Sequence, residues 1–302
     1  MPDSIPIGEL DVDVSGGRLG AFRLGAERPD APLVIAVHGI TANSRAWLPV
    51  ARALGAEANV VAFDLRGRGA SNALPPPHGI AAHTADLLAV LDHLEAGRVV
   101  LAGHSLGGYI VAKFAVQHPD RVGAAVLVDG GLTIPGSEGV DPLAFAEEFL
   151  GPALARLKLT FASREAYRGW WRQHPAFAND DVIEEDLAAY ADYDLIGSEP
   201  ELRSSVAADA VRADAEALAD LGPATHRLEV RAHLLCAPRG LLNDPNPMQP
   251  LELAEEWAAE DPRRRTVTLV PDVNHYTITL GLPGAAAVAR AIADQLSRRD
   301  ES

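Results

Sequence analysis

Ser105 stands in the pentapeptide Gly103-His104-Ser105-Leu106-Gly107, which has the pattern Gly-x-Ser-x-Gly. Glycines two residues before and after a serine leave room for a sharp, strained turn that holds the hydroxyl clear of the backbone. A serine hydroxyl is a weak nucleophile at neutral pH and needs a base within hydrogen-bond reach. The pattern therefore predicts a nucleophile, provided that a strand precedes the turn and a helix follows it.

Among the ten histidines, His275 is the best candidate for that base. It follows a late predicted strand, in the short loop 271–276, and the carboxyl ends of parallel strands are where such a sheet builds its site. We expect His38 to shape the glycine turn beside it, and His104 to point away from the serine. A further group lacks the spacing and the acidic neighbours of a metal site: His78, His83 and His93.

The base needs a carboxylate that fixes its tautomer, and two aspartates lie at the ends of predicted strands. Asp244 lies in the loop after the strand 232–237, and the chain order Ser105, Asp244, His275 is the order expected for a nucleophile elbow. Asp129 ends the strand that follows the serine helix, where it could serve from the neighbouring strand or only hold a glycine turn. We prefer Asp244 and keep Asp129 as the alternative acid.

The elements around these residues alternate between buried strands and helices. Short apolar runs, typical of strands buried on both faces, are followed by apolar residues at helical spacing. The chain opens with an antiparallel hairpin over 10–24, and the later predicted strands are 33–37, 60–63, 99–102, 124–128, 232–237 and 266–270. Such alternation means a mostly parallel sheet wound by right-handed crossovers. Ser105 then lies between a strand and a helix, as a nucleophile at this motif requires.

The alternation stops between residues 132 and 228, where Ala, Leu, Glu and Arg at helical spacing dominate. We predict a helical cap over 132–228, inserted between two parts of a core domain, 1–131 and 229–302. Large aromatic side chains gather in the predicted cap, and they could form its core or an apolar wall for a substrate. These are Phe145, Phe149, Phe161, Tyr167, Trp170, Trp171, Phe177, Tyr190 and Tyr193. We expect Trp170 or Trp171 to touch the substrate, since adjacent helical positions face different directions.

Length and composition are those of an ordinary globular protein. The 302 residues are 48% hydrophobic and 23% charged, and the net charge of −16 argues against nucleic acid or an anionic membrane as the main partner. The single cysteine, Cys236, lies in an apolar run and has no partner for an internal disulfide. The sequence opens with no basic and apolar leader, and no stretch approaches the length of a membrane span, so we expect a cytoplasmic protein.

Four motifs, in their order and separation, resemble those of the α/β-hydrolase superfamily: His38-Gly39, Asp-Leu-Arg-Gly-Arg-Gly at 64–69, the serine pentapeptide at 103–107, and Asn274-His275. The resemblance covers essentially the whole chain. It implies an α/β-hydrolase fold, in which helices flank a mostly parallel eight-stranded sheet and a helical cap is inserted. The chain departs from the family pattern at the acid, because a longer proline-rich loop replaces the usual Gly-x-x-Asp.

The resemblance also implies an oxyanion hole made by the backbone N–H groups of Ile40 and Leu106. Next to that hole, His38, Gly39 and Tyr109 are expected to bind substrate. This sequence lacks a triple-glycine version of the loop after His38, which argues against the branch that resembles hormone-sensitive lipase.

Together, these residues and the resemblance predict a serine hydrolase that cleaves carboxylic esters with small to medium apolar acyl groups through an acyl-enzyme on Ser105. Serine at the elbow, in place of aspartate, argues against haloalkane dehalogenases and epoxide hydrolases. Thioesterase, lactonase, carbon–carbon bond hydrolase and cofactor-free haloperoxidase or perhydrolase activities remain open, as does a non-catalytic small-molecule-binding homologue. The expected partner is a small apolar ester, and the chemistry calls for no metal and no cofactor.

Overall fold

The computed structural model describes residues 5–137, 139–141, 144–145, 150–178, 182–218 and 222–298. An eight-stranded sheet runs through its centre in the order β1-β2-β4-β3-β5-β6-β9-β10. The strands are β1 (Ile7–Val14), β2 (Gly17–Leu24), β3 (Leu33–Val37), β4 (Asn59–Phe63), β5 (Val99–His104), β6 (Val122–Val128), β9 (Arg231–Cys236) and β10 (Arg265–Leu269). β2 pairs antiparallel with β1 and with β4, and the other pairs of this sheet are parallel. The predicted α/β fold with a mostly parallel sheet is confirmed.

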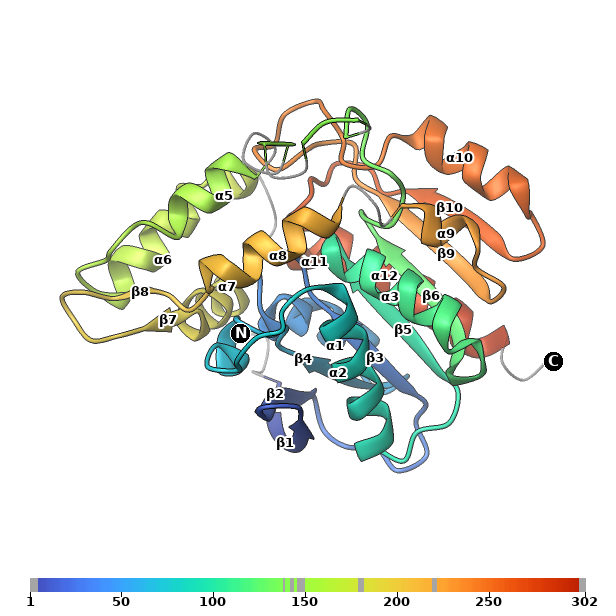
Figure 1. Ribbon diagram of the computed structural model, residues 1–302, viewed down its shortest axis with the longest axis horizontal. Coiled ribbons are helices and arrows are strands. Elements are labelled where there is room, and N and C mark those ends of the chain that lie inside the picture. Colours follow the sequence, from blue (N-terminus) through green and yellow to red (C-terminus); the bar gives the residue numbers. More distant parts are fainter. Residues whose placement is uncertain are drawn as a thin grey trace.

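The central strands carry apolar side chains on both faces, and helices cover both faces of the sheet. On one face, Ile35 and Val37 share an apolar core with helices of the near side in Figure 1. These helices are α2 (Ile80–His93), α3 (Leu106–Gln117) and α10 (Leu251–Glu260). On the other face, Val34 and Ala36 share a core with α1 (Leu48–Leu54), α11 (Thr277–Leu280) and α12 (Leu282–Ser297). Short 3₁₀ helices complete the loops: η1 (Ser44–Trp47), η2 (Gly69–Ser71), η3 (Pro119–Arg121) and η4 (Pro175–Phe177).

The strand order brings several loops to one edge of the sheet. β5 lies between β3 and β6, with Gly103 opposite Val37 and His104 opposite Val128. β9 pairs with β6 on its other side, and β10 follows β9. Because the carboxyl ends of parallel strands share an edge, the loops that begin at residues 38, 105, 129 and 270 are neighbours there.

Between β6 and β9 the chain carries α5 (Gly151–Arg156), α6 (Arg164–Arg172), α7 (Glu184–Tyr193), β7 (Leu195–Ile196), β8 (Arg203–Ser204), α8 (Ala208–Leu218) and α9 (Pro223–His226). α6 and α7 share a third apolar cluster with Tyr167, Trp171 and Tyr190, which also includes Ala46 of η1 and Leu280 of α11. α8 instead joins the core of the main sheet through Val211 and Ala215, and α9 lies against α3. We retain 132–228 as a proposed cap, and Phe149 lies outside the described residues.

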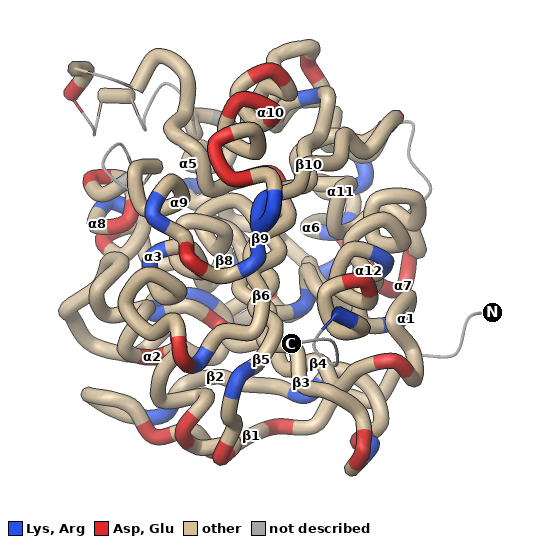
Figure 2. The backbone as a smooth tube through the Cα atoms, turned by 90° about the vertical axis from the view of Figure 1, so that its right-hand side faces the viewer, with Lys and Arg blue, Asp and Glu red and all other residues tan. Residues whose placement is uncertain are grey.

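Charged residues are distributed over the whole backbone. Asp and Glu outnumber Lys and Arg by 42 to 26. Figure 2 shows the two kinds interspersed, with a run of acidic residues on α10, whose sequence holds four glutamates. Among the helices within the described ranges, none combines the length and the apolar character needed to cross a lipid bilayer.

Candidate active site

Ser105 lies at the turn between β5 and α3, with φ 54° and ψ −122°. Its N–H donates to the Val128 carbonyl oxygen at 2.9 Å, and its own carbonyl accepts from the Gly108 N–H at 2.9 Å. A positive φ is strained for a residue that carries a Cβ, so the backbone must be held in this form. The side chain makes no capping hydrogen bond to α3, which leaves the hydroxyl free for chemistry.

Close backbone packing, which only glycine permits, holds this turn. A Cβ on Gly107 would come within 2.1 Å of the Val37 carbonyl oxygen. One on Gly130 would come within 2.3 Å of the Ser105 carbonyl oxygen. The first turn of α3 therefore lies directly against the end of β3 and the turn after β6. Its unpaired N–H groups favour negative charge at that point.

His275 is held by a buried carboxylate. Its Nδ1 lies 2.7 Å from Oδ2 of Asp129, whose side chain is fully buried at the end of β6. Oδ1 of Asp129 accepts the Ala237 N–H at 3.1 Å, so both carboxylate oxygens have partners. An aspartate in this position fixes the tautomer in which Nδ1 carries the proton and Nε2 is free to accept one.

The preference for Asp244 as the partner of His275 is wrong. The carboxylate of Asp244 instead accepts the N–H groups of Leu242 at 3.3 Å and Asn246 at 3.1 Å. The loop after β9 folds back on itself, with the Gly240 N–H donating to the Asp244 carbonyl at 2.9 Å, and this side chain closes that turn. The alternative acid, Asp129, is the one that meets the imidazole, because β6 lies next to β5.

The loop that carries His275 is fixed on both sides. Oδ1 of Asn274 accepts the N–H groups of Tyr276 and Thr277, both at 3.0 Å, and the His275 N–H donates to the Arg239 carbonyl at 3.0 Å. Ser105 and His275 line one cavity, although within the described chain their side chains are not hydrogen-bonded to each other. Such contacts are often loose in unliganded enzymes and tighten on substrate.

His104 belongs to this site, and the prediction that it points away is wrong. Its Nε2 donates to the His275 carbonyl at 2.8 Å, and the two rings lie 4.7 Å apart. It also lines the cavity at Ser105. Burial lowers the pKa of His104 well below its usual value, so the ring is neutral and acts as a support for the His275 loop.

Two backbone N–H groups are predicted to form the oxyanion hole, those of Ile40 and Leu106. Neither the Ile40 N–H nor the Leu106 N–H has an acceptor within the described residues. The carbonyl of Gly39, in the same peptide as the Ile40 N–H, accepts from Nδ1 of His38 at 2.7 Å. Since a trans peptide directs C=O and N–H in opposite directions, this bond orients the Ile40 N–H.

His38 can play this part only as a neutral ring. Its Nε2 accepts the Leu65 N–H at 3.0 Å, which assigns the proton to Nδ1. Burial lowers the pKa of His38 to about 3, so the ring stays neutral at physiological pH. Both ring nitrogens are bonded to backbone groups, so the ring can shape the loop. His38 does not line the cavity at Ser105, and its contact with substrate stays a prediction.

The cavity beside Ser105 has a volume of about 30 Å³, room for little more than one water molecule. A second one of about 10 Å³ adjoins Ser105 and Asp129 and is lined by Tyr109, whose hydroxyl donates to the Leu132 carbonyl at 2.6 Å. Tyr190, one of the aromatics that the sequence offered as a possible apolar wall, lines the first cavity. Sequence reasoning missed several other apolar lining residues: Leu150, Leu241, Tyr276 and Leu280. Tyr276 had a signal in the sequence, since it follows the base directly.

The two tryptophans predicted to touch the substrate pack among other aromatic side chains. Trp171 is 1% exposed and packs edge-on against Phe177 and Tyr190 in the aromatic core of the cap. Trp170 is half-buried beside it, with ring centroids 5.0 Å apart. Neither ring lines the cavities at Ser105, but Trp171 packs against Tyr276, which does, so a contact of either tryptophan with substrate stays a prediction. Among the described residues, no group of three or more His, Cys, Asp or Glu is placed to hold a metal ion.

Comparison with known families gives a match over more than half of the chain. A family model described as the alpha/beta hydrolase fold matches residues 32–208. This stretch includes β3 to β6, the elbow at Ser105 and Asp129.

Curated relatives match in part. Lipase LipV of Mycobacterium tuberculosis (strain ATCC 25618 / H37Rv) is 34% identical over 165 residues, which are 53% of this chain and 60% of that protein. A putative non-heme haloperoxidase of Mycobacterium phage D29 is 37% identical over 122 residues, which are 40% of this chain and 42% of that protein. The chain thus spans less than two thirds of the length of each of these relatives.

Solved structures match over nearly the whole chain. E-2-(Acetamidomethylene)succinate hydrolase superposes with a TM-score of 0.76 and 20% identity, covering 97% of this chain and 99% of that one. The thioesterase domain from the curacin biosynthetic pathway superposes with a TM-score of 0.70 and 21% identity, covering 95% and 99%. At these identities the likeness concerns the fold.

Proposed function

The chain belongs to the α/β-hydrolase-fold family, and from that premise we propose that it is a serine hydrolase that cleaves carboxylic esters through an acyl-enzyme on Ser105. The observation that carries the proposal is the 2.7 Å contact between Asp129 and His275, on the cavity that the Ser105 hydroxyl also lines. The partial likeness to a lipase adds support for an ester substrate.

The proposed reaction is acyl transfer in two halves. His275 accepts the hydroxyl proton of Ser105 at Nε2 as the oxygen attacks the ester carbonyl, and Asp129 stabilises the imidazolium that forms. The N–H groups of Ile40 and Leu106 then bind the oxyanion, and each such donor lowers the barrier by roughly 3 kcal/mol. His275 returns the proton to the leaving alcohol, and a water activated by the same ring releases the acid.

The substrate needs more room than the cavity at Ser105 offers. A groove of about 550 Å³ lies between α5 and α8, with Leu154 and Val211 among its apolar walls. Leu150 lines this groove and both small cavities at Ser105, so it stands between the hydroxyl and the larger space. We propose that the acyl group of the ester extends past Leu150 into the groove, which fits small to medium apolar chains.

Hydrolysis of a p-nitrophenyl ester series from acetate to octanoate tests the proposal, with Ser105→Ala as the inactive variant. Ser297→Ala, an exposed serine at the end of α12, is the matched control. We expect Ser105→Ala to lose at least about 10³-fold in kcat and Ser297→Ala to keep the wild-type value. Turnover that survives in Ser105→Ala would overturn the proposal. Parallel thioester and lactone substrates identify the preferred bond.

A further inference from the structure

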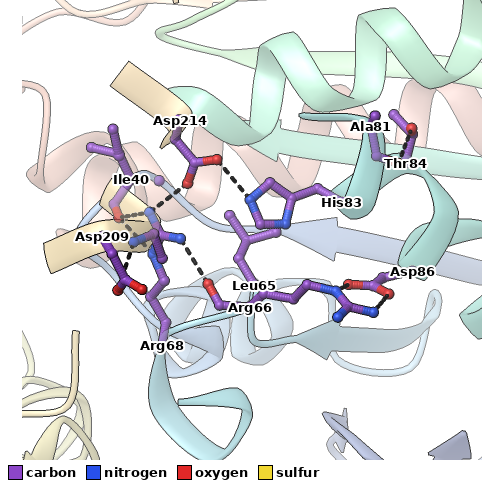
Figure 3. Close-up of polar contacts among 12 residues, drawn as sticks. Ile40, Leu65, Arg66, Arg68, Ala81, His83, Thr84, Asp86, Asp209 and Asp214 are labelled. Atoms are coloured by element: carbon purple, nitrogen blue, oxygen red, sulfur yellow. Dashed lines mark hydrogen bonds and ion pairs between the residues drawn. The ribbon is translucent and has the colours of Figure 1, made fainter. Parts of the chain in front are cut away.

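Arg68, His83 and Asp214 form a fully buried polar cluster next to the candidate site (Figure 3). Nη2 of Arg68 lies 2.6 Å from Oδ2 of Asp214, and Nε2 of His83 lies 2.9 Å from the other carboxylate oxygen. Removing such charges from water is costly, and apolar residues of similar size in their place are often as stable or more so. The cluster therefore needs an explanation other than stability.

The guanidinium of Arg68 also binds the oxyanion loop. Its Nε and Nη2 donate to the Ile40 carbonyl at 2.9 and 2.8 Å, and its Nη1 donates to the Arg66 carbonyl at 2.8 Å. The peptide before Ile40 is held by His38, as described above, and by the Ala42 N–H, which donates to the Gly39 carbonyl at 3.2 Å. Both peptide planes that flank Ile40 are therefore fixed, and with them the direction of its N–H.

Asp214 comes from α8, a helix that lies far away in the sequence and is docked on the loop that carries Arg68. The Ala207 N–H donates to the Gly67 carbonyl at 2.8 Å, and a Cβ on Gly67 would come within 2.5 Å of the Cβ of Ala210. Asp214 lies one helical turn beyond Ala210, on the same side of α8. The helix thus delivers its carboxylate to Arg68 whenever it is docked.

We propose that Asp214 is a positioning residue: by clamping Arg68 it holds the Ile40 peptide, so that the oxyanion hole is complete only when α8 is docked. The inference rests on the proposed function for its effect on turnover. Burial alone would raise the pKa of Asp214, but the charge of Arg68 and the contact with His83 hold it below the usual value. The clamp is therefore ionic at neutral pH.

The test replaces the whole pair by apolar residues of similar size, in the double variant Arg68→Met with Asp214→Leu. The matched control makes the same replacement at the pair Arg52 and Asp186, which joins α1 to α7 at 2.6 Å. Kinetics on p-nitrophenyl butyrate, thermal unfolding and hydrogen exchange of the backbone over residues 38–47 are measured for both. Hydrogen exchange is measured on the protein without substrate. It therefore tests whether Asp214 and Arg68 hold the oxyanion loop even if the wild type does not cleave esters.

We expect the Arg68 and Asp214 double variant to fold, to lose roughly 10- to 100-fold in kcat with KM within threefold, and to exchange at least fivefold faster at residues 39–43. The control pair should keep kcat and exchange within about twofold. Asp214→Asn, which leaves Arg68 and its bonds to the Ile40 carbonyl in place, is measured in the same way, and a smaller change in the same direction is expected. Unchanged exchange of the Ala42 N–H, which donates to the Gly39 carbonyl, in the folded variants would overturn the proposal, as would an equal loss of kcat in the control.

Discussion

At the scale of single residues, the site depends on one buried carboxylate. Asp129 is fully buried, contacts His275 at 2.7 Å and has its second oxygen occupied by the Ala237 N–H. An amide in its place would present an N–H₂ or a single oxygen to the imidazole, and would no longer stabilise an imidazolium. Asp244 offers a comparison within the same chain, because its carboxylate is confined to its own turn.

We expect Asp129→Asn to lower kcat on p-nitrophenyl butyrate by on the order of 10³- to 10⁴-fold, because the ring loses its anionic partner. Asp244→Asn should stay within threefold of wild type, since an amide oxygen can still accept the two N–H groups of its turn. Steady-state kinetics on both variants check this. A larger loss in Asp244→Asn than in Asp129→Asn would return the acid role to Asp244.

Leu150 gives a second prediction at this scale. Because it stands between the hydroxyl and the groove, Leu150→Trp should obstruct the path of a longer acyl chain. We expect kcat/KM for the hexanoate ester to fall at least tenfold relative to the acetate ester of the same variant. The acetate ester serves as an internal control for folding and for the catalytic groups. Equal losses on both esters would place the acyl group elsewhere.

Sequence reasoning found some site residues and missed others for physical reasons. Ser105 and His275 could be placed because a strand, a glycine-rich turn and a helix leave one conformation for the elbow, and because late strands end at the same edge. The acid was misassigned because the fold of the loop 238–250 depends on its own hydrogen bonds, which no periodic pattern reveals. The sequence could not say whether Trp170 and Trp171 belong to a core or to a pocket wall, because an aromatic core and an aromatic pocket wall have the same composition.

At the scale of elements, the contact between α3 and the sheet determines the elbow. The helix starts against the backbone of β3 with no side chain between them, at Gly107. A helix held so closely leaves Ser105 no freedom to relax its positive φ. The stability of the elbow and the orientation of the Leu106 N–H are therefore properties of the packing of one helix on two strands.

Gly107→Ala tests this packing, with Gly97→Ala as its control. The added methyl would lie 2.1 Å from the Val37 carbonyl oxygen in the first case and has nothing within 4 Å in the second. We expect Gly107→Ala to lower the free energy of unfolding by about 3 kcal/mol or more, and Gly97→Ala to change it by less than about 0.5 kcal/mol. Urea unfolding followed by circular dichroism gives both values. Similar values for both variants would contradict the close approach.

The elements themselves were largely predictable, because buried parallel strands are apolar on both faces and short. The predicted strands 33–37 and 124–128 lie within one or two residues of β3 and β6. The arrangement inside the proposed cap was not predictable. α8 joins the main core and brings Asp214 to Arg68, whereas α6 and α7 pack in another apolar cluster, together with Ala46 and Leu280. Helical periodicity marks the buried side of a helix without saying which partner covers it.

At the scale of the whole molecule, buried neutral histidines make stability depend on pH. Burial lowers the pKa of His38 to about 3 and that of His104 well below its usual value, whereas both titrate near 6.5 in an unfolded chain. Below pH 6.5 these two histidines are therefore protonated in the unfolded state but still neutral in the folded state. The stabilisation is complete above that pH and is lost as the pH falls toward the pKa values of these histidines in the folded protein.

We expect the free energy of unfolding to fall between pH 7.5 and pH 5, by about 2 kcal/mol from His38 alone, with His104 acting in the same direction. Urea unfolding at these two pH values, at constant ionic strength, measures the change. A stability that stays level or rises on acidification over this range would contradict the neutral, buried state of these rings. Such a result would also contradict the role of these neutral rings in holding the oxyanion loop and the His275 loop.

The most direct test of the central claim is covalent labelling with a fluorophosphonate, located by peptide mass spectrometry, because only an activated serine reacts rapidly with this reagent. The account predicts a single adduct on Ser105 in the native wild-type protein, formed much more slowly in Asp129→Asn and absent after denaturation. An adduct on another residue, or native Ser105 that reacts no faster than in the denatured chain, would contradict it.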